Sequence, residues 1–213
     1  EIGAEIRNQT LKLGAAWLAL QKPLGVEGDF EQALTMFGNV AGLAADQIDG
    51  VRSRIRAMST DVRQSNMDLL GGLETLVGKG LDPEQALGAI ETIGRAATAT
   101  GADVNQMANL SYSVMSNLSI PVEKLGQTLD MMAQAGKLGG FELRDMAREF
   151  PQLTAAAAAL GLTGTEAVAS LGAMLQVAMR GASDPSTAAN NLANFLAKVT
   201  SPDTVERFGR FGV

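Results

Sequence analysis

The 213-residue sequence contains no cysteine and no histidine, which removes much of the side-chain chemistry that enzymes use. Without histidine, a Ser-His-Asp triad, a Cys-His pair and an imidazole metal site are excluded. Without cysteine, disulfides, thiolate nucleophiles and cysteine-ligated metal centres are excluded. Carboxylate and lysine chemistry stay open, but no Walker, Rossmann or EF-hand pattern is found. We therefore expect no enzyme, and no catalytic, cofactor-binding or metal-binding residues.

Aromatic residues make up only 4% of the chain, and its net charge is −6. A composition poor in aromatics and rich in alanine and glycine favours close helix packing over β-sandwiches and barrels. The negative charge disfavours a dedicated nucleic-acid binder, because such affinity comes largely from neutralising phosphates. No apolar run reaches the length of about 18 residues expected of an ordinary transmembrane helix. The composition predicts an all-α chain without a specific nucleic-acid ligand or a small-molecule substrate.

From residue 30 onward, apolar residues recur at alternating spacings of four and three. The nine positions are Phe30, Leu34, Phe37, Ala41, Ala44, Ile48, Val51, Ile55 and Met58. Such a sustained heptad is the pattern of a coiled-coil seam, so we take these residues as a candidate self-association seam. The alternative is a long helix, kinked at a glycine, that packs on its own chain. A chain that is monomeric by light scattering would count against self-association.

After residue 60, the sequence reads as short helices with frequent start and stop signals. Polar residues three positions before a Glu or Gln predict capping boxes at Asp61, Asp82, Asp103 and Thr163. Prolines fit the first helical position at Pro83, Pro121 and Pro185. A weak repeat starts at Gly80, Ser119 and Gly161, with offsets of 39 and 42 residues. Each copy predicts a turn, a helix with an apolar stripe and a second, shorter helix, as in solenoids of helix pairs.

A pair of acidic residues and an apolar segment each have both a structural and a functional interpretation. Asp145 and Glu149 have the spacing of paired carboxylates, but the interleaved Arg144 and Arg148 favour surface ion pairs. The segment 151–179 carries a single charged residue and many small residues. We expect it to be a buried helix hairpin; the alternative is contact with a membrane interface.

These patterns predict an all-α fold in three parts. Residues 1–59 form a region of long helices with the heptad seam, and residues 60–208 form a multi-helix bundle or a short α-solenoid of helix pairs. Residues 209–213 are expected to be the truncated start of a further segment, in a chain cut from a longer protein.

Three sequence blocks in this order, residues 76–110, 119–153 and 158–202, carry a family resemblance. The last is the most specific: a Gly-Leu-Thr cap, a small-residue helix, Gly181, and a Thr-Ala-Ala-Asn-Asn-Leu helix that ends at Ser-Pro. Together, residues 58–208 resemble the core region of phage tail tape-measure proteins, the minor tail proteins of long-tailed phages and prophages.

The resemblance implies a structural protein in the lumen of the tail, around which tail-tube subunits polymerise until the tape runs out. It implies tail length determination and tail assembly, with a role in genome delivery. The expected partners are tail-tube proteins, tail assembly chaperones, the host envelope and other copies of the chain. The expected location is the virion tail lumen, with assembly in the host cytoplasm. Two alternatives stay open: a membrane-inserting envelope module and a generic α-solenoid adaptor.

Overall fold

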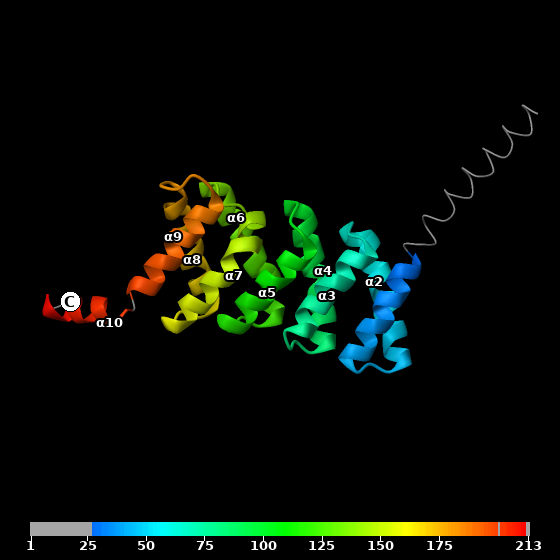
Figure 1. The fold of residues 1–213 in the computed structure, drawn as a ribbon. Coiled ribbons are helices and arrows are strands. Elements are labelled where there is room, and N and C mark those ends of the chain that lie inside the picture. Colours follow the sequence, from blue (N-terminus) through cyan, green and yellow to red (C-terminus); the bar gives the residue numbers. More distant parts are fainter. Residues whose placement is uncertain (1–26, 200, 212–213) are drawn as a thin grey trace, which may run out of the picture. The chain divides into compact units, whose positions relative to one another are not determined.

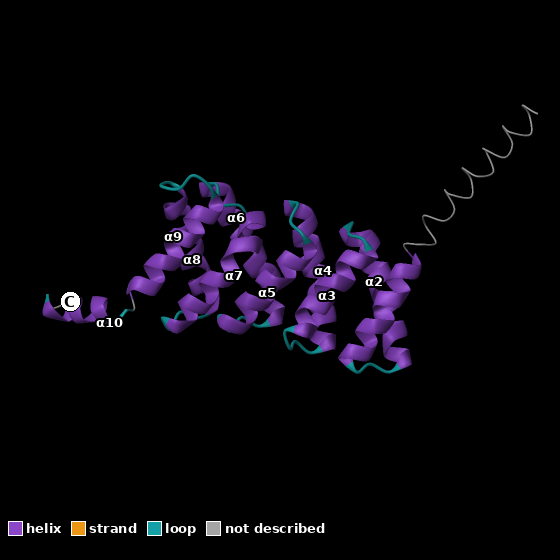
Figure 2. Ribbon diagram, in the orientation of Figure 1, coloured by secondary structure: helices purple, strands orange, loops and turns teal. Residues whose placement is uncertain are grey.

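The computed structural model describes residues 27–199 and 201–211 of the chain. Within those two ranges every regular element is a helix and no strand occurs (Figure 2). The all-α prediction is confirmed. The chain divides into two compact units between Arg54 and Ile55. Residues 1–26 of the expected long-helix region, and residues 212–213 of the expected third part, lie outside the described ranges.

The first unit contains a helical hairpin where the heptad pattern predicts one continuous seam. Residues 27–41 are helical, and α2 (Ala45–Val62) starts after a three-residue turn. Gly42 lies in the turn at a φ of +68°, and the N–H of Leu43 donates to the carbonyl of Gly38 at 2.8 Å. The N–H of Ala44 donates to Oε1 of Gln47 at 2.8 Å, which satisfies the start of α2. The seam is therefore carried by two helices.

The second unit consists of short helices arranged in two rows (Figure 1). Its elements after α2 are α3 (Asn66–Gly78), α4 (Pro83–Thr100), α5 (Val104–Asn117), the 3₁₀ turn η1 (Val122–Lys124), α6 (Leu125–Gly139), α7 (Leu143–Ala159), α8 (Gly164–Met179), α9 (Pro185–Val199) and α10 (Pro202–Arg210). The most extensive contacts join helices two apart in the chain. One row, the odd row, consists of α3, α5, α7 and α9; the other, the even row, consists of α4, α6 and α8. This arrangement is a short α-solenoid of helix pairs.

The three sequence repeats occupy equivalent places in this solenoid. Each begins with a residue in the left-handed region, at φ values of +98° for Gly80, +56° for Ser119 and +78° for Gly161. The N–H of the following residue closes the same six-residue loop each time, from Leu81 to Leu76, from Ile120 to Met115 and from Leu162 to Ala157, at 3.0–3.2 Å. An even-row helix follows each loop. One detail of the prediction is wrong: α7, with 17 residues, is longer than α6, with 15.

Some of the predicted start signals act as expected, whereas Thr163 makes no side-chain capping hydrogen bond and Pro121 is the N-cap of η1, not its first residue. Asp82 accepts hydrogen bonds from the N–H groups of Glu84 and Gln85, and Asp103 accepts one from Gln106. Pro83 and Pro185 are the first residues of α4 and α9. The predicted cap at Asp61 is wrong. This residue lies in the last turn of α2, and Ser65 caps α3 by accepting from the N–H of Asp68 at 3.0 Å.

The segment 151–179 places one face of each of its two helices in the core. On α7, Leu153, Thr154 and Ala157 are fully buried, and Asn117 of α5 donates to Oγ1 of Thr154 at 2.8 Å. On α8, Leu171 and Leu175 are fully buried. None of the described helices is both long and apolar enough to cross a membrane. The expectation of a buried hairpin therefore holds for one face of each helix only, since Val177 of α8 is 69% exposed.

Candidate functional site

The seam predicted from the heptad pattern is largely buried within the single chain. Six of its nine residues are at most 8% exposed: Phe30, Leu34, Phe37, Val51, Ile55 and Met58. Ala41 and Ile48 are half-buried, and Ala44 in the turn is exposed. A contact between copies through the buried positions therefore requires the hairpin to open. Self-association through the seam stays a prediction.

The two helices of the hairpin approach each other closely at Gly38. A Cβ atom at this position would overlap the Cδ1 and Cγ1 atoms of Ile48 on α2. The glycine therefore makes room for a seam side chain of the other helix, which offsets its unfavourable helix propensity.

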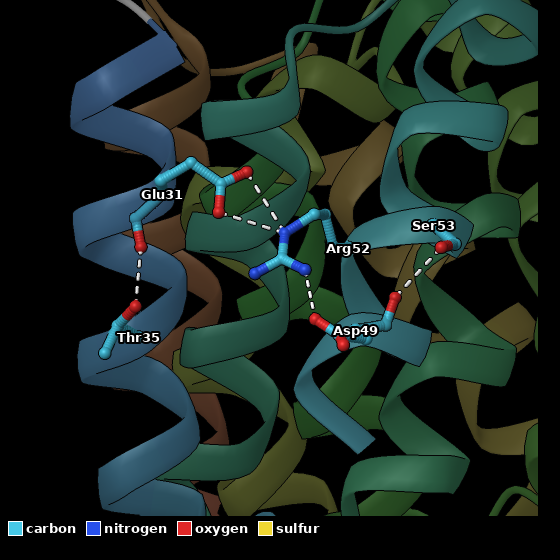
Figure 3. Close-up of polar contacts among 5 residues, drawn as sticks. All are labelled: Glu31, Thr35, Asp49, Arg52 and Ser53. Carbon is cyan, nitrogen blue, oxygen red and sulfur yellow. Dashed lines mark hydrogen bonds and ion pairs between the residues drawn. The ribbon is translucent and has the colours of Figure 1, made fainter. Parts of the chain in front are cut away.

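Polar groups join the same two helices at the surface (Figure 3). Nε of Arg52 on α2 donates to both carboxylate oxygens of Glu31 on the preceding helix, at 2.9 and 3.1 Å. Nη1 of Arg52 also donates to Oδ1 of Asp49, and this bond, followed by the contacts with Glu31, raises the pKa of Arg52 against the effect of desolvation. Both acids thus pair with an arginine of the hairpin, as in a structural ion-pair network.

The carboxylates of Asp145 and Glu149 on α7 both form ion pairs with Arg148. Nη2 of Arg148 lies 3.1 Å from Oδ1 of Asp145, and its Nε lies 3.6 Å from Oε1 of Glu149. The interpretation as surface ion pairs is confirmed for these three residues. Among the described residues, no group of three or more acidic side chains is placed to hold a metal ion.

An apolar surface lies on the last helices of the two rows, α8 and α9, and it was not predicted from the sequence. A groove of about 410 Å³ lies between α8 and α9, here named the α8–α9 groove. Its lining is Ala173, Met174, Val177, Ala178, Asn191, Leu192 and Phe195. Val177 is 69% exposed and Phe195 is 57% exposed, although Phe195 comes three residues after the buried Leu192, a spacing that fits a buried helix face. Leu196 is buried there instead, at 3% exposure.

A second groove, of about 380 Å³, lies between α6 and α8 and shares Ala173 and Val177 with the first. Leu138 of α6 lines it and is 89% exposed. The signal for this surface was present in the sequence: α8 carries a single charged residue, Glu166, and has apolar residues on all its faces. A helix that is apolar all round is normally covered on more than one side.

Residues 52–213 match the model of a family described as phage-related minor tail protein. The chain is 33% identical to the "Probable tape measure protein" of Burkholderia phage BcepMu, over 99% of the chain and 26% of that protein. It is 22% identical to the "Tape measure protein" of Pneumococcus phage Dp-1, over 83% of the chain and 15% of that protein. No solved structure matches the chain.

The chain thus spans about a quarter of the length of the first relative and less of the second. The family match covers most of the chain and the whole second unit. The resemblance to phage tape-measure proteins that the three sequence blocks indicated is confirmed. The chain belongs to the phage-related minor tail protein family.

Proposed function

We propose that this chain is a structural, non-enzymatic segment of a phage tape-measure protein, acting in tail length determination and tail assembly. The observation that carries the proposal is the 33% identity to a probable tape measure protein over 99% of the chain. We further propose that the segment lies in the lumen of the virion tail and is assembled there from the host cytoplasm. Its proposed partners are tail-tube proteins and tail assembly chaperones, and the host envelope during genome delivery.

The two-row architecture makes this segment much shorter than a continuous helix of the same number of residues, so it would add little to the length of a tape. If residues 83–199 formed one continuous helix, they would span roughly 175 Å at 1.5 Å per residue. In the solenoid the helices run back and forth, so each helix pair extends a row by only one helix-to-helix step of about 8–10 Å. We propose that the second unit stays folded on the tape as a compact module, while other parts of the protein supply most of the length.

An in-frame deletion of residues 119–160 in the phage gene tests this function. The deletion removes one repeat, from Ser119 to the residue before Gly161, and joins two equivalent turns. Tail lengths are then read by electron microscopy. A folded module predicts tails shorter by about 10 Å, and an extended tape predicts tails shorter by about 63 Å.

A point variant provides the matched control. Val40→Asp changes an exposed side chain and keeps the residue count, so tail length should stay the same. Unchanged tail length in the deletion, with loss of infectivity, would replace the length role by a role in delivery. Unchanged tails with full infectivity would contradict both parts of the proposal.

A further inference from the structure

The α8–α9 groove lies where the even row of the solenoid would continue. Within this row, α6 packs against α4, and α8 packs against α6 and also contacts α7. At the last step of the row, α8 therefore covers the preceding even-row helix, α6, and touches α7, the odd-row helix between them in the chain. In the described part of the chain, the even row ends at α8, and the groove formed by α8 and α9 is the corresponding position for a next helix.

The helix that follows α9 in the chain has the start signal and the spacing of the next even-row helix. The N-cap residues of the even-row helices α4, α6 and α8 are Asp82, Lys124 and Thr163, which are 42 and 39 residues apart. Ser201, the N-cap of α10, comes 38 residues after Thr163, and Pro202 is the first residue of α10. The internal repeat therefore predicts an even-row helix at the place in the sequence where α10 starts.

The apolar surfaces of α10 and of the groove are both uncovered. Phe208 is 47% exposed and Phe211 is 82% exposed. Glu206 and Arg210 form an ion pair at 2.5 Å one helical turn apart, and Phe208, two residues from each, lies on the opposite side of α10. The helix thus has one apolar face and one charged face, and only the apolar face suits a groove lined by Met174 and Phe195.

We propose that α10 folds back onto the α8–α9 groove as the fourth helix of the even row, with Phe208 inserted between α8 and α9. The occupant is α10 of the same chain, because the short connection to α9 gives it a far higher effective concentration than a second copy. Docking continues the contacts that already join α4, α6 and α8, and it covers the α8–α9 groove. The inference does not depend on the proposed role in tail length.

Engineered cysteine pairs test the docking directly, because the chain has no cysteine of its own. Under mild oxidation, Met174→Cys with Phe208→Cys should form a disulfide within one chain. The positive control is Ala135→Cys with Gly172→Cys, since a Cβ at Gly172 lies 4.0 Å from the Cβ of Ala135, within the range of disulfides. The matched negative control is Met174→Cys with Glu206→Cys, which places the second thiol on the charged face of α10.

Docking predicts that the Phe208 pair closes several-fold faster than the Glu206 pair and approaches the rate of the positive control. Equal rates for the two pairs would overturn the proposal. A disulfide that forms only between chains would also overturn it, because a second copy would then be the occupant.

Hydrogen exchange gives a second readout that needs no cysteine. Phe195→Asp places a charge in the α8–α9 groove, whereas Leu138→Asp places one in the α6–α8 groove; both residues are more than half exposed, so the core is left intact. Docking predicts faster exchange of the α10 amides in Phe195→Asp and unchanged exchange in Leu138→Asp. Identical exchange of α10 in both variants and in the parent chain would contradict the proposal.

Discussion

The backbone N–H of Gly164 donates a 2.6 Å hydrogen bond to the carbonyl oxygen of Leu118, so the start of α8 touches the end of α5. The chain leaves this point to form α6 and α7 and then returns to it. The helix pair α6–α7 therefore starts and ends at neighbouring positions of the backbone. The two turns that flank it both contain a residue in the left-handed region, Ser119 and Gly161. Such a pair can be treated as one structural unit of the solenoid.

The first prediction concerns those two turns. Ser119 adopts a φ of +56°, which is unfavourable for a residue with a Cβ, whereas the equivalent Gly161 at +78° has no such cost. Ser119→Gly should raise the free energy of unfolding by about 0.5–1 kcal/mol, and Gly161→Ser should lower it by a similar amount. Chemical denaturation of the two variants measures both changes. Changes of the same sign would show that the turns are not equivalent.

The second prediction concerns the close approach of α6 to the start of α7. A Cβ at Gly136 would lie 2.9 Å from both Cα of Glu142 and the carbonyl oxygen of Phe141, which are backbone atoms. Gly136→Ala should therefore lower the free energy of unfolding by about 1–3 kcal/mol. Gly88→Ala is the matched control, since nothing lies within 4 Å of its Cβ position in the middle of α4. The control variant should be more stable than the parent chain by about 1 kcal/mol. If both substitutions lowered the free energy of unfolding, the loss at Gly136 could not be assigned to its close approach to the backbone at the start of α7.

The third prediction concerns the stability of the fold at low pH. Asp184, just before α9, accepts hydrogen bonds from the N–H of Thr187 at 2.9 Å and from the hydroxyls of Ser183 and Thr187 at 2.7 and 2.8 Å. These bonds, led by the one from the Thr187 N–H, lower the pKa of Asp184 to about 2. Because the folded-state pKa lies below the unfolded value, the carboxylate stabilises the fold above pH about 4. This stabilisation is lost as the pH falls through the folded-state pKa.

Asp184→Asn provides the comparison, because the amide does not titrate. The difference in unfolding free energy between the parent chain and Asp184→Asn should be constant near neutral pH and shrink as the pH falls from about 4 to about 2. Thermal unfolding at a series of pH values measures it. A difference that is independent of pH would mean that the carboxylate is not the group that caps α9.

The fourth prediction tests the heptad seam. Self-association through the seam predicts a mass above that of the monomer in light scattering at tens of micromolar chain. Ile48→Asp places a charge at a half-buried seam position and should reduce that mass, whereas Val40→Asp, at an exposed position outside the seam, should not. A monomer in all three cases would mean that the seam serves only to close the hairpin.

The sequence predicted the helices and several of their start signals where the signal is local. Asp82, Asp103 and Pro83 act at the helix starts because a cap needs only the next three residues. The alternative of a helix kinked at a glycine and packed on its own chain comes close to the observed hairpin. The full break at Gly42 was not predicted, because the turn contains as many residues as one seam spacing and the heptad phase therefore continues through it unchanged. A pattern of apolar spacing does not distinguish one long helix from two helices that share its phase.

The two rows and the open groove depend on contacts between helices that are distant in the sequence. The repeat indicated helix pairs, but which helices pack together follows from tertiary contacts that a single sequence does not contain. Phe195 and Leu196 show this limit of a single sequence. They lie three and four residues after Leu192, and both spacings fit a buried helix face, but only Leu196 is buried. The apolar side chains on every face of α8 were the one sequence signal for the groove.

The central claim is that this segment contributes to the tape as a folded module, and tail length as a function of repeat number tests it most directly. Electron microscopy would compare three phages: one lacking residues 119–160, the parent, and one with this repeat duplicated. The account predicts that tail length rises in even steps of about 10 Å per repeat. Steps of about 63 Å would mean that the segment unfolds into a continuous helix. Equal tail lengths in all three phages would contradict the account.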